Sequence, residues 1–195
     1  NYLKNRTQDE YLRWKRDYWL NFLTEHNINL RPFEQILDAG CGPAGIFTVL
    51  DEQLVEAIDP LVQEFDAKLD HFTASDYPYV QFYSYAIEQL NFKDRYDTIF
   101  CLNAINHVNN LKLCLNNLFA ALKNGGRIFI TVDAHKSNFL KKLFQTLPGD
   151  ILHPQQFSIN DYNNFFQQAG FTDIYSKSIK HDRIFNYHFF ELHKK

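Results

Sequence analysis

The sequence predicts a doubly wound α/β fold, on three observations. Short apolar runs typical of strands alternate with helix-like segments from residue 35 to about residue 132. A glycine-rich turn, Asp38-Ala-Gly40-Cys-Gly42-Pro-Ala-Gly45, directly follows the first apolar run. Near the end, two strand-like runs flank Lys180-His-Asp182, which predicts a hairpin. We therefore expect a mostly parallel seven-stranded sheet with a C-terminal antiparallel hairpin and helices on both faces.

The expected elements follow one another without a repeat or a long linker, so we expect a single domain over residues 1–195. An amphipathic helix is expected at 7–26, where aromatic and leucine side chains recur among charged ones. Strands are expected at 36–38, 55–59, 80–83, 97–102, 127–132, 171–179 and 183–192. Helices are expected at 42–51, 61–69, 111–123 and 158–168; the last begins at a capping box and stops at Gly170.

Composition argues against several classes of protein. A net charge of −3 provides no basic surface for nucleic acid, and no apolar run approaches the roughly 18 residues of a membrane span. Cys41, Cys101 and Cys114 are odd in number and widely spaced, which indicates a reducing cytoplasm and not a disulfide framework. No metal is expected, because His, Cys and carboxylate residues form no ligand-like cluster. Nothing in the sequence decides the oligomeric state.

The glycine turn is the strongest local signal of a binding site. Three of the seven glycines lie there at G-x-G-x-x-G spacing. A missing Cβ lets a ligand approach the backbone and permits a positive φ angle. We expect the first strand to turn into a helix whose free N–H groups face a ligand; a purely architectural turn is the alternative.

The ends of the following strands also carry polar residues, where ligands of open α/β sheets bind. Asp59 ends the second strand, about 20 residues beyond Gly40, and its two oxygens can accept hydrogen bonds from both ribose hydroxyls. Because Pro60 follows, Asp59 can alternatively be a helix cap. Asn103 and Asn106 follow the fourth strand and can bind a ligand or satisfy local backbone groups.

The charge of Asp38 separates two nucleoside cofactors that fit this geometry. A dinucleotide would bring its pyrophosphate beside this carboxylate, which is unfavourable. S-adenosyl-L-methionine has no phosphate and would bring an ammonium and a sulfonium, which a carboxylate stabilises in a partly dry cleft. The sequence therefore favours the sulfonium cofactor.

The chain resembles the class I S-adenosylmethionine-dependent methyltransferases. The glycine turn is similar to the first motif of that family, and Ile58-Asp59 to its acidic end of strand two. Further similarity lies in Tyr96–Val108, Leu122-Lys-Asn-Gly125-Gly126 and Gln168-Ala-Gly170-Phe171, in the family's order. The resemblance implies a Rossmann-like fold, methyltransferase activity and S-adenosyl-L-methionine as cofactor. It assigns cofactor binding to Asp38, Gly40, Cys41, Gly42, Gly45, Asp59, Pro60, Ile87, Glu88 and Asn103.

The sequence departs from the family pattern after the third strand. Many members have an acidic residue and then alanine there, whereas this chain has Ala86 and Ile87. We therefore expect adenine to be held by the Ile87 backbone and apolar packing. Glu88 is either a neighbouring acceptor or a solvated turn residue.

Methyl transfer to a hydroxyl or an ammonium requires a general base, and three histidines are candidates. His107 follows Asn103 closely and can instead be structural, while His135 and His153 flank the segment least similar to the family. We expect a helical lid at 1–30, a cofactor-binding core at 31–133, a substrate cap at 134–160, and a final helix and hairpin at 161–195.

The leading functional prediction is a methyltransferase acting on an O, N or S nucleophile, most simply of a small molecule. A non-catalytic S-adenosylmethionine-binding module is a second hypothesis, motivated by Ala86 and by the missing unmistakable base. A nicotinamide oxidoreductase is a third, permitted by the glycine spacing and Asp59 but opposed by Asp38 and Gly125-Gly126.

Overall fold

The computed structural model describes residues 7–135, 157–181 and 185–195. The strands are β1 (Gln35–Ala39), β2 (Leu54–Ile58), β3 (Val80–Tyr83), β4 (Tyr96–Leu102), β5 (Leu122–His135), β6 (Thr172–His181) and β7 (Phe185–His193). The α-helices are α1 (Gln8–Glu25), α2 (Val62–Lys68), α3 (Leu111–Ala121) and α5 (Ile159–Ala169). Short 3₁₀ turns are η1 (Ile46–Val49), η2 (Ala74–Asp76), η3 (Ile87–Gln89) and η4 (Ile105–His107).

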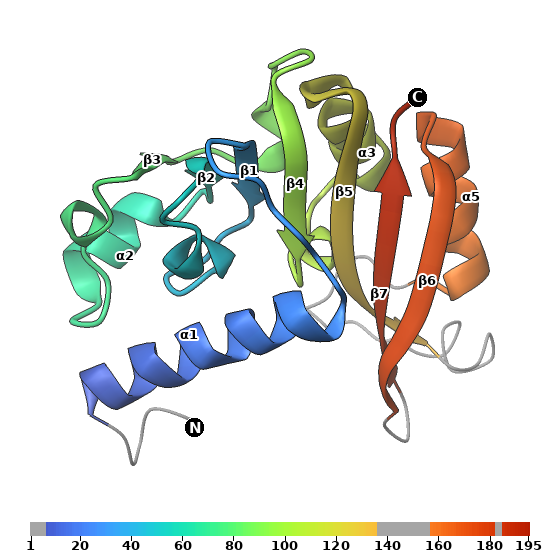
Figure 1. Cartoon of the computed structure of the whole chain (residues 1–195). Helices are drawn as coiled ribbons and strands as arrows, with labels where there is room; N and C mark the ends of the chain where they lie inside the picture. Colours follow the sequence, from blue (N-terminus) through green and yellow to red (C-terminus); the bar gives the residue numbers. More distant parts are fainter. Residues whose placement is uncertain (1–6, 136–156, 182–184) are drawn as a thin grey trace.

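The strands form one sheet in the order β3-β2-β1-β4-β5-β7-β6 (Figure 1). β1 to β5 run parallel, and β7 pairs antiparallel with both β5 and β6. The strand order reverses beside β1, which is the point where ligands of doubly wound sheets bind. The predicted fold class, a mostly parallel sheet with a C-terminal hairpin, is confirmed.

Two apolar clusters cover the two faces of the sheet. Successive side chains of a strand point to opposite faces, so one strand contributes residues to both clusters. In β4, Ile99 packs into the cluster beneath α3 and α5, whereas Phe100 packs into the cluster beneath α1 and η1. Both side chains are fully buried. Such strands, buried on both faces, explain why the parallel part of the sheet has near-continuous apolar runs.

The helix expected at 42–51 is wrong, because this segment contains only the 3₁₀ turn η1. The Thr48 hydroxyl donates to the Gly45 carbonyl at 2.9 Å and competes with a regular helical bond. β-branched residues at 46, 48 and 49 further weaken helix formation. All four η1 residues are buried, so tertiary packing determines their conformation.

Helix α1 lies across the carboxyl ends of the parallel strands (Figure 1). It begins at a capping box in which Thr7 and Glu10 bind each other's backbone N–H groups. Phe22 contacts Phe189 of β7 with ring centroids 5.8 Å apart, and buried Trp19 donates its indole N–H to the Ala44 carbonyl at 2.9 Å. The helix is thus attached both to the sheet and to the glycine turn. No helix in the described ranges is long and apolar enough to cross a bilayer.

Replacement of Trp19 by phenylalanine tests this attachment. Phenylalanine keeps an aromatic ring but leaves the Ala44 carbonyl without its indole donor. We expect the free energy of unfolding to fall by about 1–3 kcal/mol. Urea unfolding followed by circular dichroism measures this change, and an unshifted midpoint would contradict the attachment.

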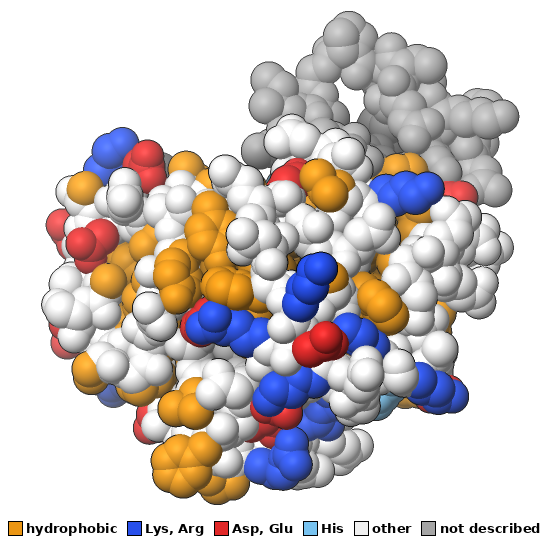
Figure 2. Space-filling view, turned by 90° about the horizontal axis from the view of Figure 1, so that it is seen from above, with side chains coloured by type: hydrophobic (Ala, Val, Ile, Leu, Met, Phe, Trp, Pro, Cys, Tyr) orange, Lys and Arg blue, Asp and Glu red, His pale blue; other side chains and the backbone are white. Residues whose placement is uncertain are grey.

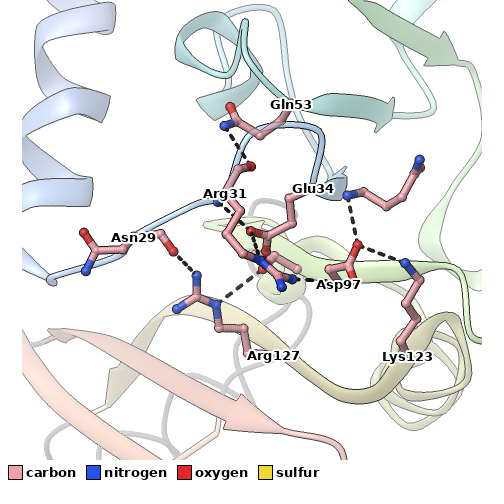
Figure 3. A network of polar contacts seen from close by, with 9 residues as sticks. Asn29, Arg31, Glu34, Gln53, Asp97, Lys123 and Arg127 are labelled. Atoms are coloured by element: carbon pink, nitrogen blue, oxygen red, sulfur yellow. Dashed lines mark hydrogen bonds and ion pairs between the residues drawn. The ribbon is translucent and has the colours of Figure 1, made fainter.

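The opposite end of the sheet carries a polar network. Lys and Arg side chains gather beside Asp and Glu on this face (Figure 2). Asp97 accepts from Lys123 at 2.9 Å and lies 3.9 Å from Arg31, while Arg127 donates to the Asn29 carbonyl (Figure 3). The network joins the segment after α1 to the amino ends of β4 and β5. It therefore lies at the end of the sheet opposite to the carboxyl ends of the parallel strands.

Candidate functional site

Two cavities open at the carboxyl ends of the parallel strands and share Gly40, Gly42 and Asn103 in their walls. The α1 cavity has a volume of about 800 Å³ and is lined by Tyr11, Trp14, Lys15, Tyr18 and Trp19 of α1, residues 40–45, 102 and 103, and Tyr187. The η3 cavity has a volume of about 480 Å³ and is lined by residues 40, 42, 58–61, 65, 85–88, 103, 104 and 107–109. A ligand with two chemically different ends can occupy both.

Gly40 and Gly42 form the ridge between the cavities, and both have positive φ angles, of 76° and 57°. A Cβ at Gly40 would overlap the Cβ of Ala104, so the β1 and β4 loops can approach only with glycine there. A Cβ at Gly42 would meet no protein atom within 4 Å. The space beside the Gly42 backbone is therefore open.

Asp38 lies behind the glycine turn and lines neither cavity. Its side chain is 2% exposed, and it accepts a hydrogen bond from the Phe47 N–H at 3.1 Å. A Cβ at Gly45 would come within 2.6 Å of its Oδ2 atom. Burial raises the pKa of Asp38 to about 7, despite the bonds from the Phe47 and Ile46 N–H groups, and the charge of Asp59 adds to the increase. Two of the N–H groups that were expected to face a ligand, those of Ile46 and Phe47, therefore donate to Asp38.

Asp59 combines the two roles that the sequence left open. Its Oδ1 accepts from the Leu61 N–H at 2.9 Å, as a cap would, and its Oδ2 accepts from the Gly42 N–H at 3.1 Å. Asp59 and Pro60 also line the η3 cavity. A carboxylate has about four lone-pair sites, so it retains acceptor capacity toward the cavity.

Glu88 lines the η3 cavity, but its Oε1 accepts from the Asn109 and Asn110 N–H groups at 2.8 and 3.3 Å. Burial alone would raise its pKa; the backbone donors outweigh burial and lower it. Glu88 is thus an anchor for the loop after β4, and not a solvated turn residue. The Asn117 amide donates to the carbonyls of Ile87 and Glu88 at 3.2 and 2.9 Å, which holds the turn in place.

Asn103, at the end of β4, has a φ of 55°, and its N–H donates to the Thr131 hydroxyl at 2.8 Å. The same hydroxyl accepts from Tyr187 at 2.8 Å, and Tyr187 shares a hydrogen bond with Tyr18 of α1. This chain of contacts connects α1, β7, β5 and the β4 loop around the α1 cavity. Sequence analysis singled out Asn103 but missed its connection to Thr131 and Tyr187, which are distant in sequence and lie in no motif.

Comparison with known proteins places this geometry in a family. A family model described as a methyltransferase domain matches residues 9–176. The chain belongs to the methyltransferase domain family. The match confirms the predicted family, the class I S-adenosylmethionine-dependent methyltransferases, whose cofactor is S-adenosyl-L-methionine, and supports it over the nicotinamide oxidoreductases.

The ubiquinone biosynthesis O-methyltransferase of Rickettsia akari is 32% identical to this protein, over 84% of this chain and 68% of the relative. The enzyme of that name from Rickettsia bellii is 32% identical over 64% of this chain, which spans about half of that relative, 52% of its length. Among solved structures, phosphoethanolamine N-methyltransferase 2 of Haemonchus contortus shares the fold at a TM-score of 0.69 and 14% identity, covering 91% of this chain and 52% of that one.

Of the three candidate bases, only His107 has a side chain among the described residues. His107 lines the η3 cavity and not the α1 cavity. His135 ends β5 with a side chain outside the described residues, and His153 lies outside them entirely. No group of three His, Cys, Asp or Glu side chains that could hold a metal occurs in the described ranges.

Cys41 lines the α1 cavity between the two positive-φ glycines, and its side chain is buried. Burial, together with the charges of Asp38 and Asp59, raises the pKa of the Cys41 thiol well above its ordinary value. The thiol is therefore protonated and acts as a small apolar side chain in the cavity wall.

Proposed function

We propose that this protein transfers the methyl group of S-adenosyl-L-methionine to an oxygen, nitrogen or sulfur nucleophile of a small molecule. The observation that carries the proposal is the pair of cavities meeting at Gly40, Gly42 and Asn103. The cofactor joins a nucleoside to an amino acid, and one cavity suits each half. The open space beside Gly42 is where the two halves would meet.

The nucleoside half fits the η3 cavity. Asp59 would accept hydrogen bonds from the ribose hydroxyls, while its bonds to Gly42 and Leu61 hold it in orientation. Pro60, Ile87 and Glu88 would surround the adenine, with the Ile87 side chain and backbone in contact with the ring. The absence of an acidic side chain at Ala86 leaves backbone groups and packing to recognise the base.

The amino-acid half fits the α1 cavity, against Gly40, Cys41, Gly42 and Asn103. Asp38 would act on its positive charge from behind the turn, with Gly45 leaving room for the carboxylate. When bound, the cofactor supplies an activated methyl group, so the protein's contribution is alignment and exclusion of water. Helix α1 would provide both, as the lid proposed for residues 1–30.

An acceptor sharing the α1 cavity would lie beside aromatic rings and tyrosine hydroxyls. An oxygen nucleophile is supported by the relatives named as O-methyltransferases. His107 faces the other cavity, so we place the base role with His135 or His153, at or within the proposed cap at 134–160. The remaining parts of the proposed single domain are the cofactor-binding core at 31–133 and the final helix and hairpin at 161–195.

The described cysteines are all free and buried, which supports the proposed cytoplasmic location. The net charge of −3 likewise supports a small-molecule acceptor over nucleic acid.

Asp59→Ala tests the nucleoside half of the proposal. Loss of its acceptors should weaken binding of S-adenosylhomocysteine by about 1–3 kcal/mol, which isothermal titration calorimetry measures. Asp51→Ala, which removes an exposed carboxylate outside both cavities, serves as the control. An unchanged dissociation constant for Asp59→Ala would mean that Asp59 only holds the glycine turn through its bonds to Gly42 and Leu61 and does not contact the cofactor.

A non-catalytic S-adenosylmethionine-binding module is the second candidate. It is supported by the lack of a histidine or carboxylate among the described residues that line the α1 cavity. Release of S-adenosylhomocysteine in a screen of small phenols, amines and thiols would exclude it. Tight cofactor binding without turnover across the screen would favour it.

A further inference from the structure

Lys15 is a cation in the wall of the α1 cavity that no motif assigns. It lies on the face of α1 that also carries Trp14, Tyr18 and Trp19, and its Nζ is 5.3–5.7 Å from the centroids of all three rings. The side chain is half-buried, and burial lowers the pKa of its amine. Among the residues that line this cavity and are described, Lys15 alone is basic.

No described carboxylate forms an ion pair with Lys15, although other lysines pair with Asp94, Asp97 and Asp173. A cation that has lost part of its hydration is costly unless it is paired. Cation–π contacts with the three aromatic faces offset part of this cost. An anion entering the cavity would provide the missing partner.

The glycine turn offers few alternative donors for an anion. The Gly40 and Cys41 N–H groups donate to the Ile58 carbonyl at 2.8 and 3.1 Å. The Gly42 N–H donates to Asp59, and the Phe47 N–H to Asp38. Residue 43 is a proline and has no N–H. The turn leads into the four-residue 3₁₀ turn η1 and not into an α-helix, so the usual anion site of such turns, a helix N-terminus, is not present at this place.

We propose that Lys15 is the anion-binding residue of the α1 cavity and binds a carboxylate-type oxygen anion. The anion can come from two sources: the amino-acid end of the cofactor or an acid group on the acceptor. In either case the ammonium of Lys15 donates to an anionic oxygen, and the surrounding rings exclude water from the contact. This inference rests on the proposed function, because it assumes that both molecules use this cavity.

The test compares ligands that differ in one charged part. S-adenosylhomocysteine carries the amino acid; 5′-methylthioadenosine has the same nucleoside and a thioether but no amino acid. 4-Hydroxybenzoate, titrated into protein saturated with S-adenosylhomocysteine, represents an acidic acceptor. Each is titrated calorimetrically into the wild type, Lys15→Met and Lys15→Arg. Arg13→Met removes a charge from an exposed position of α1 outside both cavities and is the control.

We expect Lys15→Met to weaken the binding of one anionic probe about tenfold to a hundredfold and to leave the binding of 5′-methylthioadenosine unchanged. Lys15→Arg should restore most of the lost affinity, and Arg13→Met should bind every probe as the wild type does. A loss confined to S-adenosylhomocysteine assigns the anion to the cofactor, and a loss confined to 4-hydroxybenzoate assigns it to the acceptor. If S-adenosylhomocysteine and 5′-methylthioadenosine bind but no probe depends on Lys15, the inference about Lys15 is overturned and the proposed function stands. If the wild type binds neither S-adenosylhomocysteine nor 5′-methylthioadenosine, the proposed function fails and the inference fails with it.

Discussion

Gly40→Ala is expected to destabilise the protein by about 2–5 kcal/mol. Two costs add at this position: the backbone has a φ of 76°, which disfavours a side chain, and the new methyl group would overlap the Cβ of Ala104. The backbone at residue 40 cannot shift freely away from Ala104, because the Gly40 N–H is bonded to the Ile58 carbonyl of β2 at 2.8 Å. Urea unfolding of the two proteins measures the difference.

Gly42→Ala is the matched control, since Gly42 also has a positive φ but open space around its missing Cβ. Only the backbone cost of about 1–2 kcal/mol should appear in its unfolding free energy. Its methyl group would enter the space proposed for the cofactor, so binding of S-adenosylhomocysteine should fall more than stability does. Equal destabilisation by both variants would contradict the role assigned to Ala104.

Asp38→Asn should change how stability depends on pH. In the folded wild type the pKa of Asp38 is about 7, above its ordinary value of 3.8, so from about pH 4 to pH 7 the folded state holds a proton that the unfolded state has lost. Stability therefore decreases as pH rises through this window, and the full penalty is present above pH 7. Three pKa units correspond to at most about 4 kcal/mol.

Asparagine keeps an oxygen for the Phe47 N–H but does not ionise. The Asn variant should be less stable than, or equal to, the wild type near pH 4 and should gain relative to it by pH 8. Denaturant unfolding across this range gives the comparison, with the exposed Asp51→Asn as control. Parallel pH curves for wild type and Asp38→Asn would show that Asp38 ionises normally in the fold.

The strands were predictable because burial on both faces leaves a direct compositional trace. Ile99 and Phe100 enter opposite cores, so β4 must be apolar at successive positions. The final helix was predictable because its ends are local: Ser158 caps the first turn and Gly170, with a φ of 102°, ends it. The segment at 42–51 was not, because its conformation depends on contacts with distant elements, such as the bond from Arg16 to the Thr48 carbonyl.

The sequence by itself determined the fold class, the glycine turn and the acidic residues beside it, because each depends on neighbours along the chain. Only the tertiary structure decided how these residues act: Asp38 accepts backbone donors behind the turn, and Asp59 holds Gly42. Only the tertiary structure, too, brought Lys15 and Tyr187 into one cavity. The physical reason is that orientation, burial and pairing depend on residues far apart in sequence, which no local pattern specifies.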